Sequence, residues 1–243
     1  MERGGYQLAR HALVSLFKLV FPPACPLCKK TLPGGATDIF CSACRAGIVP
    51  LPRAHCPRCL QPFRGVSHSG HLCGRCLQTP PAFSGVFAVG LYEQSLRRAV
   101  QSFKFNQHIS LDRPLARLLD DHLVPPPAVD LIVPVPLHVR DLQKRSYNQS
   151  LLLARELARL RKCPLHETLL LKTRQTAAQH QLSARQREAN LAGAFSLAER
   201  VDGLDVLLVD DVMTTGATVE HCSRVLLAGG AKQVSVVVIG RAA

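Results

Sequence analysis

The sequence contains no tryptophan, and aromatic residues of all kinds make up only 5% of its 243 residues. Many proteins that bind single-stranded nucleic acid stack bases on aromatic side chains, so few positions here suit that role. Phe103, Phe105 and Tyr147 lie beside basic residues and are the candidates. Packing within the protein is the simpler explanation for all three.

Long hydrophobic runs are also absent, because charged residues or prolines interrupt the apolar stretches before the roughly 20 residues needed to cross a bilayer. Residues 12–21 imitate a secretory leader, yet Lys18 breaks that run and the apolar positions recur with helical spacing. We therefore predict an amphipathic helix within residues 1–24 and a cytoplasmic protein. Peripheral contact of this helix with the inner membrane is the alternative.

Acidic residues are scarce in the first third of the chain. Residues 1–81 contain 10 Lys and Arg but only 2 Asp and Glu, whereas the rest of the chain contains 20 and 15. Most of the formal net charge of +13 therefore belongs to the first third. Such an excess favours a polyanionic partner for this part, such as nucleic acid.

Eight of the ten cysteines form four CxxC pairs. Two sulfurs separated by two residues can face one ion from a tight turn, and two such turns complete the four thiolates of a tetrahedral Zn²⁺ site. Large apolar residues are few in this segment, so metal binding has to order it. We predict a double zinc ribbon over residues 25–82 with two structural Zn²⁺ ions. The predicted ligands are Cys25, Cys28, Cys41, Cys44, Cys56, Cys59, Cys73 and Cys76.

Two questions about this cysteine-rich module stay open at this point. Disulfides would need an oxidising compartment, and an iron–sulfur cluster is the other alternative to zinc. The spacing does not decide whether neighbouring pairs share an ion or whether the pairing is interleaved. Cys163 and Cys222 stand apart from the pairs and are predicted to be ordinary buried or partly buried thiols.

From about residue 86 onward, short continuous apolar runs alternate with helical patterns. Such runs are typical of strands buried on both faces, so helices must cover a mainly parallel sheet. The predicted class is α/β, with a parallel sheet flanked by helices in a domain of residues 83–243. Strands are predicted at 86–92, 131–136, 206–210 and 234–240, and helices at 94–105, 113–123, 148–161 and 215–228.

Two carboxylates and a Thr/Gly loop follow the third predicted strand, in the segment VLLVDDVMTTGATVE. Ligands bind open α/β sheets at the carboxyl ends of strands, and backbone N–H groups at the start of the next helix can converge on a phosphate. Asp210 and Asp211 would repel that phosphate but suit two ribose hydroxyls one sugar length away, directly or through Mg²⁺. The predicted phosphate loop consists of Thr214, Thr215, Gly216, Ala217 and Thr218.

This segment resembles the phosphoribosyl pyrophosphate (PRPP) motif of type I phosphoribosyltransferases, in which four apolar residues precede two acids and a TTGAT loop. It lacks the GKS or GKT element of a Walker phosphate loop. The order of parts extends the resemblance over the whole chain. Paired CxxC turns, then VPVPLHVRDLQKRSYNQSLLLARELA at 133–158, then KTRQTAAQHQLSARQREANLAGAF at 172–195, resemble the ComF family.

The resemblance implies a type I phosphoribosyltransferase-like fold that binds PRPP together with Mg²⁺. It places Val135, Pro136 and Leu137 in the loop whose backbone faces the pyrophosphate. Residues 172–190 occupy the place of the flexible loop that closes over the substrate. The basic residues that the resemblance assigns to the pyrophosphate are Arg145 first, Arg174 second and Arg140, with Lys144, Lys172, Arg185 and Arg187 as further candidates.

ComF relatives are associated with natural competence, so the resemblance implies a protein that binds PRPP and single-stranded DNA during uptake or use of external DNA. The alternative is an active phosphoribosyltransferase acting on an unidentified acceptor, with turnover left open. A third hypothesis is an adaptor that docks onto uptake-machinery proteins through its ribbons. Pyrophosphate release from PRPP, salt-dependent DNA binding and tight protein partners distinguish the three.

Overall fold

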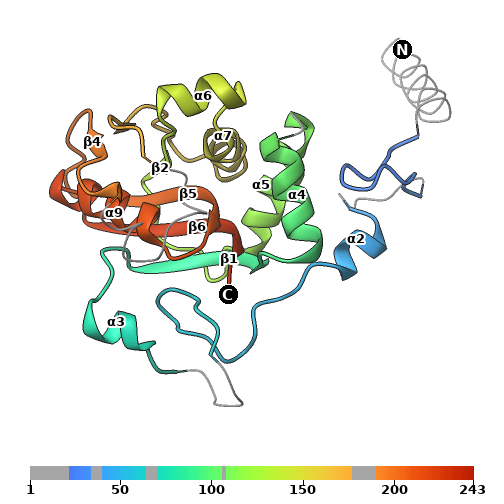
Figure 1. The fold of residues 1–243 in the computed structure, drawn as a ribbon, viewed down its shortest axis with the longest axis horizontal. Coiled ribbons are helices and arrows are strands. Elements are labelled where there is room, and N and C mark those ends of the chain that lie inside the picture. Colours follow the sequence, from blue (N-terminus) through green and yellow to red (C-terminus); the bar gives the residue numbers. More distant parts are fainter. Residues whose placement is uncertain (1–21, 34–39, 64–69, 106–107, 177–189) are drawn as a thin grey trace, which may run out of the picture.

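The computed structural model of the chain describes residues 22–33, 40–63, 70–105, 108–176 and 190–243. Figure 1 shows a central sheet with helices packed against it and two cysteine-rich modules at its periphery. The sheet has four strands in the order β1-β6-β5-β2, and every neighbouring pair is parallel. Its strands are β1 (Gly85–Leu91), β2 (Leu131–Pro134), β5 (Asp205–Met213) and β6 (Gln233–Arg241).

The four strands of this sheet form where the apolar runs predict them. β5 and β6 occupy the centre, and β6 is buried from its second residue to its last. Strands buried on both faces need side chains that are apolar at successive positions, and β-branched valines supply them here. The predicted parallel α/β sheet is therefore confirmed.

Successive residues of the central strands enter two different cores, because side chains alternate between the faces of a sheet. On one face, Leu207 and Val209 pack with α4 (Gln94–Phe105), α5 (Asp112–His122) and α7 (Gln149–Arg161). On the other face, Val206 and Leu208 pack with α9 (Ala217–Ala228) and with the second cysteine-rich module. The sheet is thus covered on both sides.

Within the α/β domain, four short elements were not predicted from the sequence. These are α6 (Val139–Arg145), the 3₁₀ turn η1 (Ile109–Leu111) and a hairpin of β3 (Leu170–Lys172) with β4 (Phe195–Leu197). Helix α6 buries none of its residues, so it leaves no apolar periodicity to detect. It is set by its caps instead, since the His138 side chain accepts from the Arg140 N–H and Ser146 is left-handed with φ 67°.

The two cysteine-rich modules lie against different parts of the α/β domain (Figure 1). The first contains α2 (Ser42–Ala46) and packs with Leu96 of α4, while the second contains α3 (Gly74–Gln78) and packs against the sheet face that carries α9. Within the described residues, no helix is long and apolar enough to span a bilayer. The amphipathic helix predicted within residues 1–24 falls almost wholly outside the described residues.

The first module docks on β1 through a close approach of two backbones. The Leu91 N–H donates to the Val49 carbonyl over 2.8 Å, and the Ser95 N–H donates to the Gly47 carbonyl over 3.1 Å. A Cβ atom on Gly90 would lie 2.3 Å from the Val49 carbonyl oxygen. Only glycine therefore permits this contact at position 90.

We predict that Gly90→Ala lowers the free energy of unfolding by about 1–3 kcal/mol, because the added methyl group forces the two backbones apart. Urea denaturation of the purified chain measures this change. Gly85→Ala is the matched control in the same strand, since a Cβ there would meet no atom within 4 Å. Its effect should stay within about 0.5 kcal/mol, and equal losses in the two variants would contradict the close approach.

Candidate metal centres and candidate phosphate site

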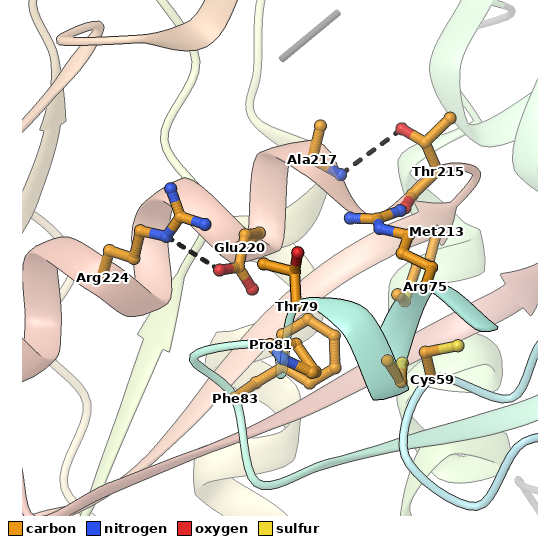
Figure 2. Close-up of a pocket in the computed structure, with 11 residues that line it drawn as sticks. Cys59, Arg75, Thr79, Pro81, Phe83, Met213, Thr215, Ala217, Glu220 and Arg224 are labelled. Carbon is orange, nitrogen blue, oxygen red and sulfur yellow. Dashed lines mark hydrogen bonds and ion pairs between the residues drawn. The ribbon is translucent and has the colours of Figure 1, made fainter. Parts of the chain in front are cut away.

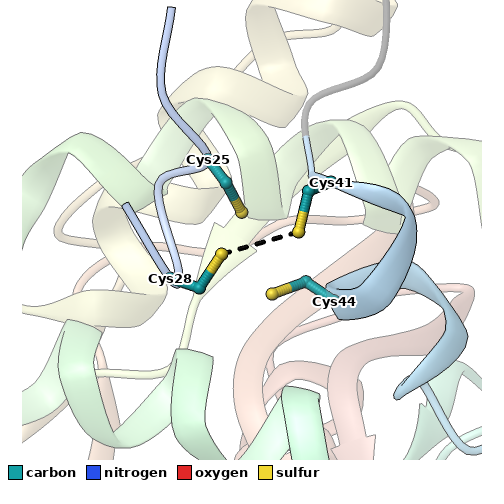
Figure 3. A group of neighbouring side chains, drawn as sticks. All are labelled: Cys25, Cys28, Cys41 and Cys44. Atoms are coloured by element: carbon teal, nitrogen blue, oxygen red, sulfur yellow. Dashed lines mark hydrogen bonds between the residues drawn. The ribbon is translucent and has the colours of Figure 1, made fainter. Parts of the chain in front are cut away.

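The structure gathers the eight paired cysteines into two separate groups. Cys25, Cys28, Cys41 and Cys44 form the first tetrad, shown in Figure 3. Cys56, Cys59, Cys73 and Cys76 form the second tetrad. The four sulfurs of each tetrad lie within 4.8 Å of one another. Neighbouring pairs therefore share a site, and the interleaved pairing left open by the sequence is excluded.

The geometry of both tetrads fits a tetrahedral zinc ion. Zn–S bonds of about 2.3 Å place the sulfurs of a tetrahedron about 3.8 Å apart. The Sγ atoms of Cys28 and Cys41 are 3.5 Å apart, and those of Cys59 and Cys73 are 3.7 Å apart. All eight cysteines are free thiols rather than disulfides. The two tetrads have the ligand set of structural zinc ribbons.

Electrostatics within each tetrad also favours a cation. Burial opposes ionisation, yet hydrogen bonds from backbone groups of the turns lower the pKa of Cys25 to about 6 and that of Cys56 to about 7. Burial and the neighbouring thiols raise the pKa of Cys44 and Cys76. The backbone thus prepares one thiolate in each tetrad, and a divalent ion is needed to stabilise all four.

The acidic pair ends up in two different contacts. Asp210 Oδ1 accepts hydrogen bonds from Ser150 Oγ over 2.9 Å and from the Asp211 N–H over 2.8 Å. Asp211, only 6% exposed, pairs its Oδ2 with Lys104 Nζ at 2.8 Å. Asp210 therefore contacts the start of α7, whereas Asp211 contacts α4.

Burial and the charge of Asp211 raise the pKa of Asp210 to about 7, against the opposing effect of Lys104. Burial would lower the pKa of Lys104, but the charge and hydrogen bond of Asp211 outweigh it and raise that pKa. Lys104 therefore stays charged beside Asp211, whereas Asp210, with a pKa of about 7, is poised between its two protonation states.

Three basic side chains, those of Lys104, Lys172 and Arg145, lie near the acidic pair. Burial lowers the pKa of Lys172, while the charges of Asp141 and Asp210 oppose that shift. The positive charge of Arg145 lowers the pKa of both Lys104 and Lys172. These cations lie close enough to interact with one another, as expected of a site that receives a multiply charged anion.

The predicted phosphate loop forms the turn between β5 and α9. Gly216 is the residue before the helix and is left-handed, with φ 82°, a conformation that glycine adopts without strain. The Ala217 N–H donates to Thr215 Oγ1 over 3.4 Å. The first N–H groups of α9 thus lie at the carboxyl end of the central strand, the arrangement that favours an anion.

The segment assigned to pyrophosphate leaves the sheet next to β5. The Val135 N–H donates to the Val209 carbonyl over 2.9 Å. The Val135 carbonyl accepts from the side-chain amide of Asn148 over 3.0 Å, and the side-chain Oδ1 of Asn148 caps the start of α7 by accepting from two of its N–H groups. Pro136 and Leu137 follow, half-buried, before α6. The Asn148 amide therefore ties this loop to the helix beside the acidic pair.

The predicted basic contacts are not equally placed. Arg145 lies within the electrostatic neighbourhood of Lys104 and Lys172. Arg174 donates to the carbonyls of Asn190 and Ala192, and Arg140 donates to the Gln175 side chain, so both hold the segment around residue 175. Lys144 is exposed at the end of α6. Arg185 and Arg187 lie outside the described residues.

Three residues of this site, namely Lys104, Ser150 and Gln149, were not predicted from the sequence. Gln149 is 1% exposed, and its Nε2 has no hydrogen-bond partner among the described residues. A buried donor of this kind calls for an acceptor such as a ligand oxygen. The position of Gln149, directly after Asn148 in the segment that resembles the ComF family, could have identified it as a site residue. Nothing in the sequence links Lys104 to Asp211.

The aromatic residues are used for packing. Phe103 is fully buried, and its ring lies 5.9 Å from that of Tyr147. Tyr147 donates its hydroxyl to the Phe103 carbonyl. These two rings therefore pack against each other, and the side chain of Phe105 lies outside the described part of the structure.

A cavity of about 300 Å³ lies behind the phosphate loop, between the second tetrad and α9. Figure 2 shows Pro81 and Phe83 on its apolar side, with Arg75 and Arg224 among the residues that line it. The carboxylate of Glu220 faces it but is engaged, because Arg224 Nε donates to it over 2.8 Å and the Ala82 N–H over 2.9 Å. The cavity thus combines an apolar wall with basic groups.

Two known domain families match separate parts of the chain. Residues 16–77 match the double zinc ribbon domain, and residues 147–242 match the phosphoribosyl transferase domain. The DNA utilization protein YhgH of Salmonella typhi is 38% identical over 224 residues, which cover 90% of this chain and 96% of that protein. Its counterpart in Escherichia coli strain K12 is 37% identical with the same coverage. Competence protein F of Haemophilus influenzae is 32% identical over 83% of this chain and 96% of its own length.

We predict that the purified chain contains two zinc ions and that Cys25→Ser contains one, because a single missing thiolate opens the first tetrad without touching the second. Elemental analysis after gel filtration measures the ratio of zinc to protein. Cys163→Ser is the control, since Cys163 is a half-buried thiol outside both tetrads, and it should retain both ions. Loss of both ions in Cys25→Ser would show that the tetrads are not independent.

Proposed function

We infer, because this chain belongs to the ComF family, that it binds PRPP with Mg²⁺ at the carboxyl edge of its sheet and single-stranded DNA on its arginine-rich ribbons. Its role would lie in the uptake or use of external DNA, as the names of its relatives indicate for those proteins. The observation that carries the proposal is the meeting of Asp210, Asp211 and the phosphate loop at the end of β5 with cations from three other elements.

The charges of this edge suit a sugar phosphate with a pyrophosphate group. The phosphate loop supplies backbone donors at a helix N-terminus for the 5-phosphate. Asp210 and Asp211 supply acceptors for the ribose hydroxyls and ligands for Mg²⁺. Lys104, Arg145 and Lys172 supply positive charge for the pyrophosphate. Each part of PRPP thereby has groups of complementary chemistry.

Nucleic-acid binding is supported by an unusual stretch of the ribbons. Residues 39–92 contain no Asp or Glu and no Lys, but they contain five arginines. Guanidinium groups bind phosphate oxygens bidentately, and no carboxylate of the stretch competes with a phosphate for them. The described arginines of the stretch are Arg45, Arg53, Arg58 and Arg75.

The cavity behind the phosphate loop adds a place for a nucleotide on the same surface. Pro81 and Phe83 offer apolar atoms to a base, while Arg75 and Arg224 line the same cavity and offer positive charge to the phosphate of that nucleotide. Stacking rings are not required for such a contact, in keeping with the burial of Phe103. We propose that the DNA strand runs along the second ribbon past this cavity.

We predict that Asp210→Asn weakens PRPP binding about 10- to 100-fold, because a charged acceptor for ribose or Mg²⁺ is lost. Binding should also lose its pH dependence. Asp210 has a pKa of about 7 and must be ionised to bind, so affinity for the wild-type chain should rise between pH 6 and pH 8. Calorimetric titration with PRPP and Mg²⁺ at several pH values measures both effects.

Asp211→Asn tests the second carboxylate, and Asp121→Asn is the control, because Asp121 is an exposed aspartate of α5 away from the site. The control should bind PRPP as the wild type does. Absence of PRPP binding by the wild-type chain, or an unchanged affinity in both Asp210→Asn and Asp211→Asn, would reject the proposed ribose site.

For the DNA surface, we predict that Arg53→Ala combined with Arg58→Ala, two arginines of the second ribbon, reduces the salt dependence of single-stranded DNA binding. Each lost phosphate contact should lower the slope of log K against log salt by about 0.7. Fluorescence anisotropy with a labelled oligonucleotide at several salt concentrations gives this slope. Arg117→Ala with Arg159→Ala, exposed arginines of α5 and α7, should leave it unchanged, and equal slopes for all three chains would reject the surface.

A further inference from the structure

One buried guanidinium connects the second ribbon to the phosphate loop. Arg241, the last residue of β6, is only 3% exposed. Its Nε donates to the Cys59 carbonyl over 2.9 Å, and its Nη2 donates to Gln61 Oε1 over 2.5 Å. Its Nη1 donates to the carbonyls of Met213 and Thr214. A cysteine of the second tetrad and the start of the loop are therefore bound to the same side chain.

A second guanidinium reaches the next peptide of the loop. Arg75 lies between Cys73 and Cys76, and its Nη1 donates to the Thr215 carbonyl. Figure 2 shows this side chain extending from α3 towards Thr215. Three consecutive carbonyls, those of residues 213 to 215, are thus held by two arginines from the ribbon side of the loop.

Holding these carbonyls also orients the N–H groups that follow them. In a trans peptide the C=O of one residue and the N–H of the next point in opposite directions. With the carbonyls of residues 213–215 turned towards the ribbon, the N–H groups of residues 214–216 point away from it. A positive charge on a carbonyl oxygen also polarises the peptide and makes its N–H a stronger donor.

We propose that the second tetrad is part of the phosphate-binding machinery, with Arg75 and Arg241 as positioning residues that hold the phosphate loop in its binding geometry. Metal in this tetrad fixes the turns that carry Cys59 and Arg75, and so couples zinc occupancy to affinity for a phosphate ligand. The inference rests on the proposed PRPP site.

Among the described residues, no side chain connects the first tetrad to the phosphate loop in this way. Its buried members Cys25 and Cys44 belong to the core on the opposite side of the sheet, with Leu96 and Leu115. The second tetrad instead shares a core with Met213, directly before the phosphate loop, and with Ala217 in the loop. Loss of metal from the first tetrad should therefore leave the loop in place, whereas loss from the second should release it.

Cys73→Ser and Cys41→Ser form a matched pair of variants in the full chain, because each cysteine directly precedes the short helix of its module. Each should lose one zinc ion. We expect Cys73→Ser to weaken binding of PRPP with Mg²⁺ at least tenfold and Cys41→Ser to change it less than twofold, measured by calorimetry. Equal losses in the two variants, or no loss in either, would overturn the inference.

Arg75→Ala separates positioning from folding, because Arg75 is exposed and is not a zinc ligand. This variant should retain two zinc ions and the wild-type melting temperature, yet bind PRPP at least fivefold more weakly. Arg117→Ala, an exposed arginine of α5, is its control. Wild-type affinity in Arg75→Ala would contradict a positioning role.

Hydrogen exchange of the peptide that contains residues 213–218 tests the coupling without any ligand. Exchange in this peptide should be faster in Cys73→Ser and Arg75→Ala than in the wild type, and unchanged in Cys41→Ser. This readout distinguishes two failures. A wild-type chain that does not bind PRPP overturns the proposed function, whereas unchanged exchange in Cys73→Ser and Arg75→Ala overturns the coupling.

Discussion

The pairing of β5 with β6 is the interaction on which the rest of this molecule depends. The register places Met213 opposite Arg241, and the ladder between the two strands runs the length of β5. The acidic pair, the start of the phosphate loop and the buried arginine are therefore brought to one edge of the sheet by the same hydrogen bonds. A slip of one residue would turn Asp210 and Asp211 to the wrong faces.

Metal takes the place of a hydrophobic core in the ribbons, and it does so differently in each. The first tetrad packs with α4 and α5, and the close backbone contact at Gly90 attaches this module to β1. The second tetrad packs on the sheet face that carries α9 and against the phosphate loop. Two sites of the same chemistry thus have different neighbours, so their loss is expected to have different consequences.

Asp210 and Asp211 do not behave as two equivalent free carboxylates. Asp211 forms an ion pair with Lys104, while Asp210 has a pKa of about 7, close to neutral pH. A cationic ligand such as Mg²⁺ would favour the ionised form of Asp210. The site therefore has one carboxylate paired with a cation and one whose pKa lies near neutral pH.

Much of this arrangement follows from the sequence, because it rests on local patterns. The four CxxC pairs specify two metal sites, the valine-rich runs specify four buried strands, and the acidic pair with its Thr/Gly loop specifies a strand end followed by a helix. Helix bounds were predicted to within about two residues, since the apolar periodicity ends where the helices end. Capped elements such as α6 escaped prediction because they bury nothing.

The sequence by itself determined which residue types are present and their local order: the cysteine pairs, the buried strands and the phosphate loop. Only the tertiary structure decided which pairs share a metal, that Lys104 meets Asp211, and that Arg75 and Arg241 hold the loop. These contacts join residues far apart in the chain. No local pattern encodes them, because they depend on how the sheet and the ribbons pack together.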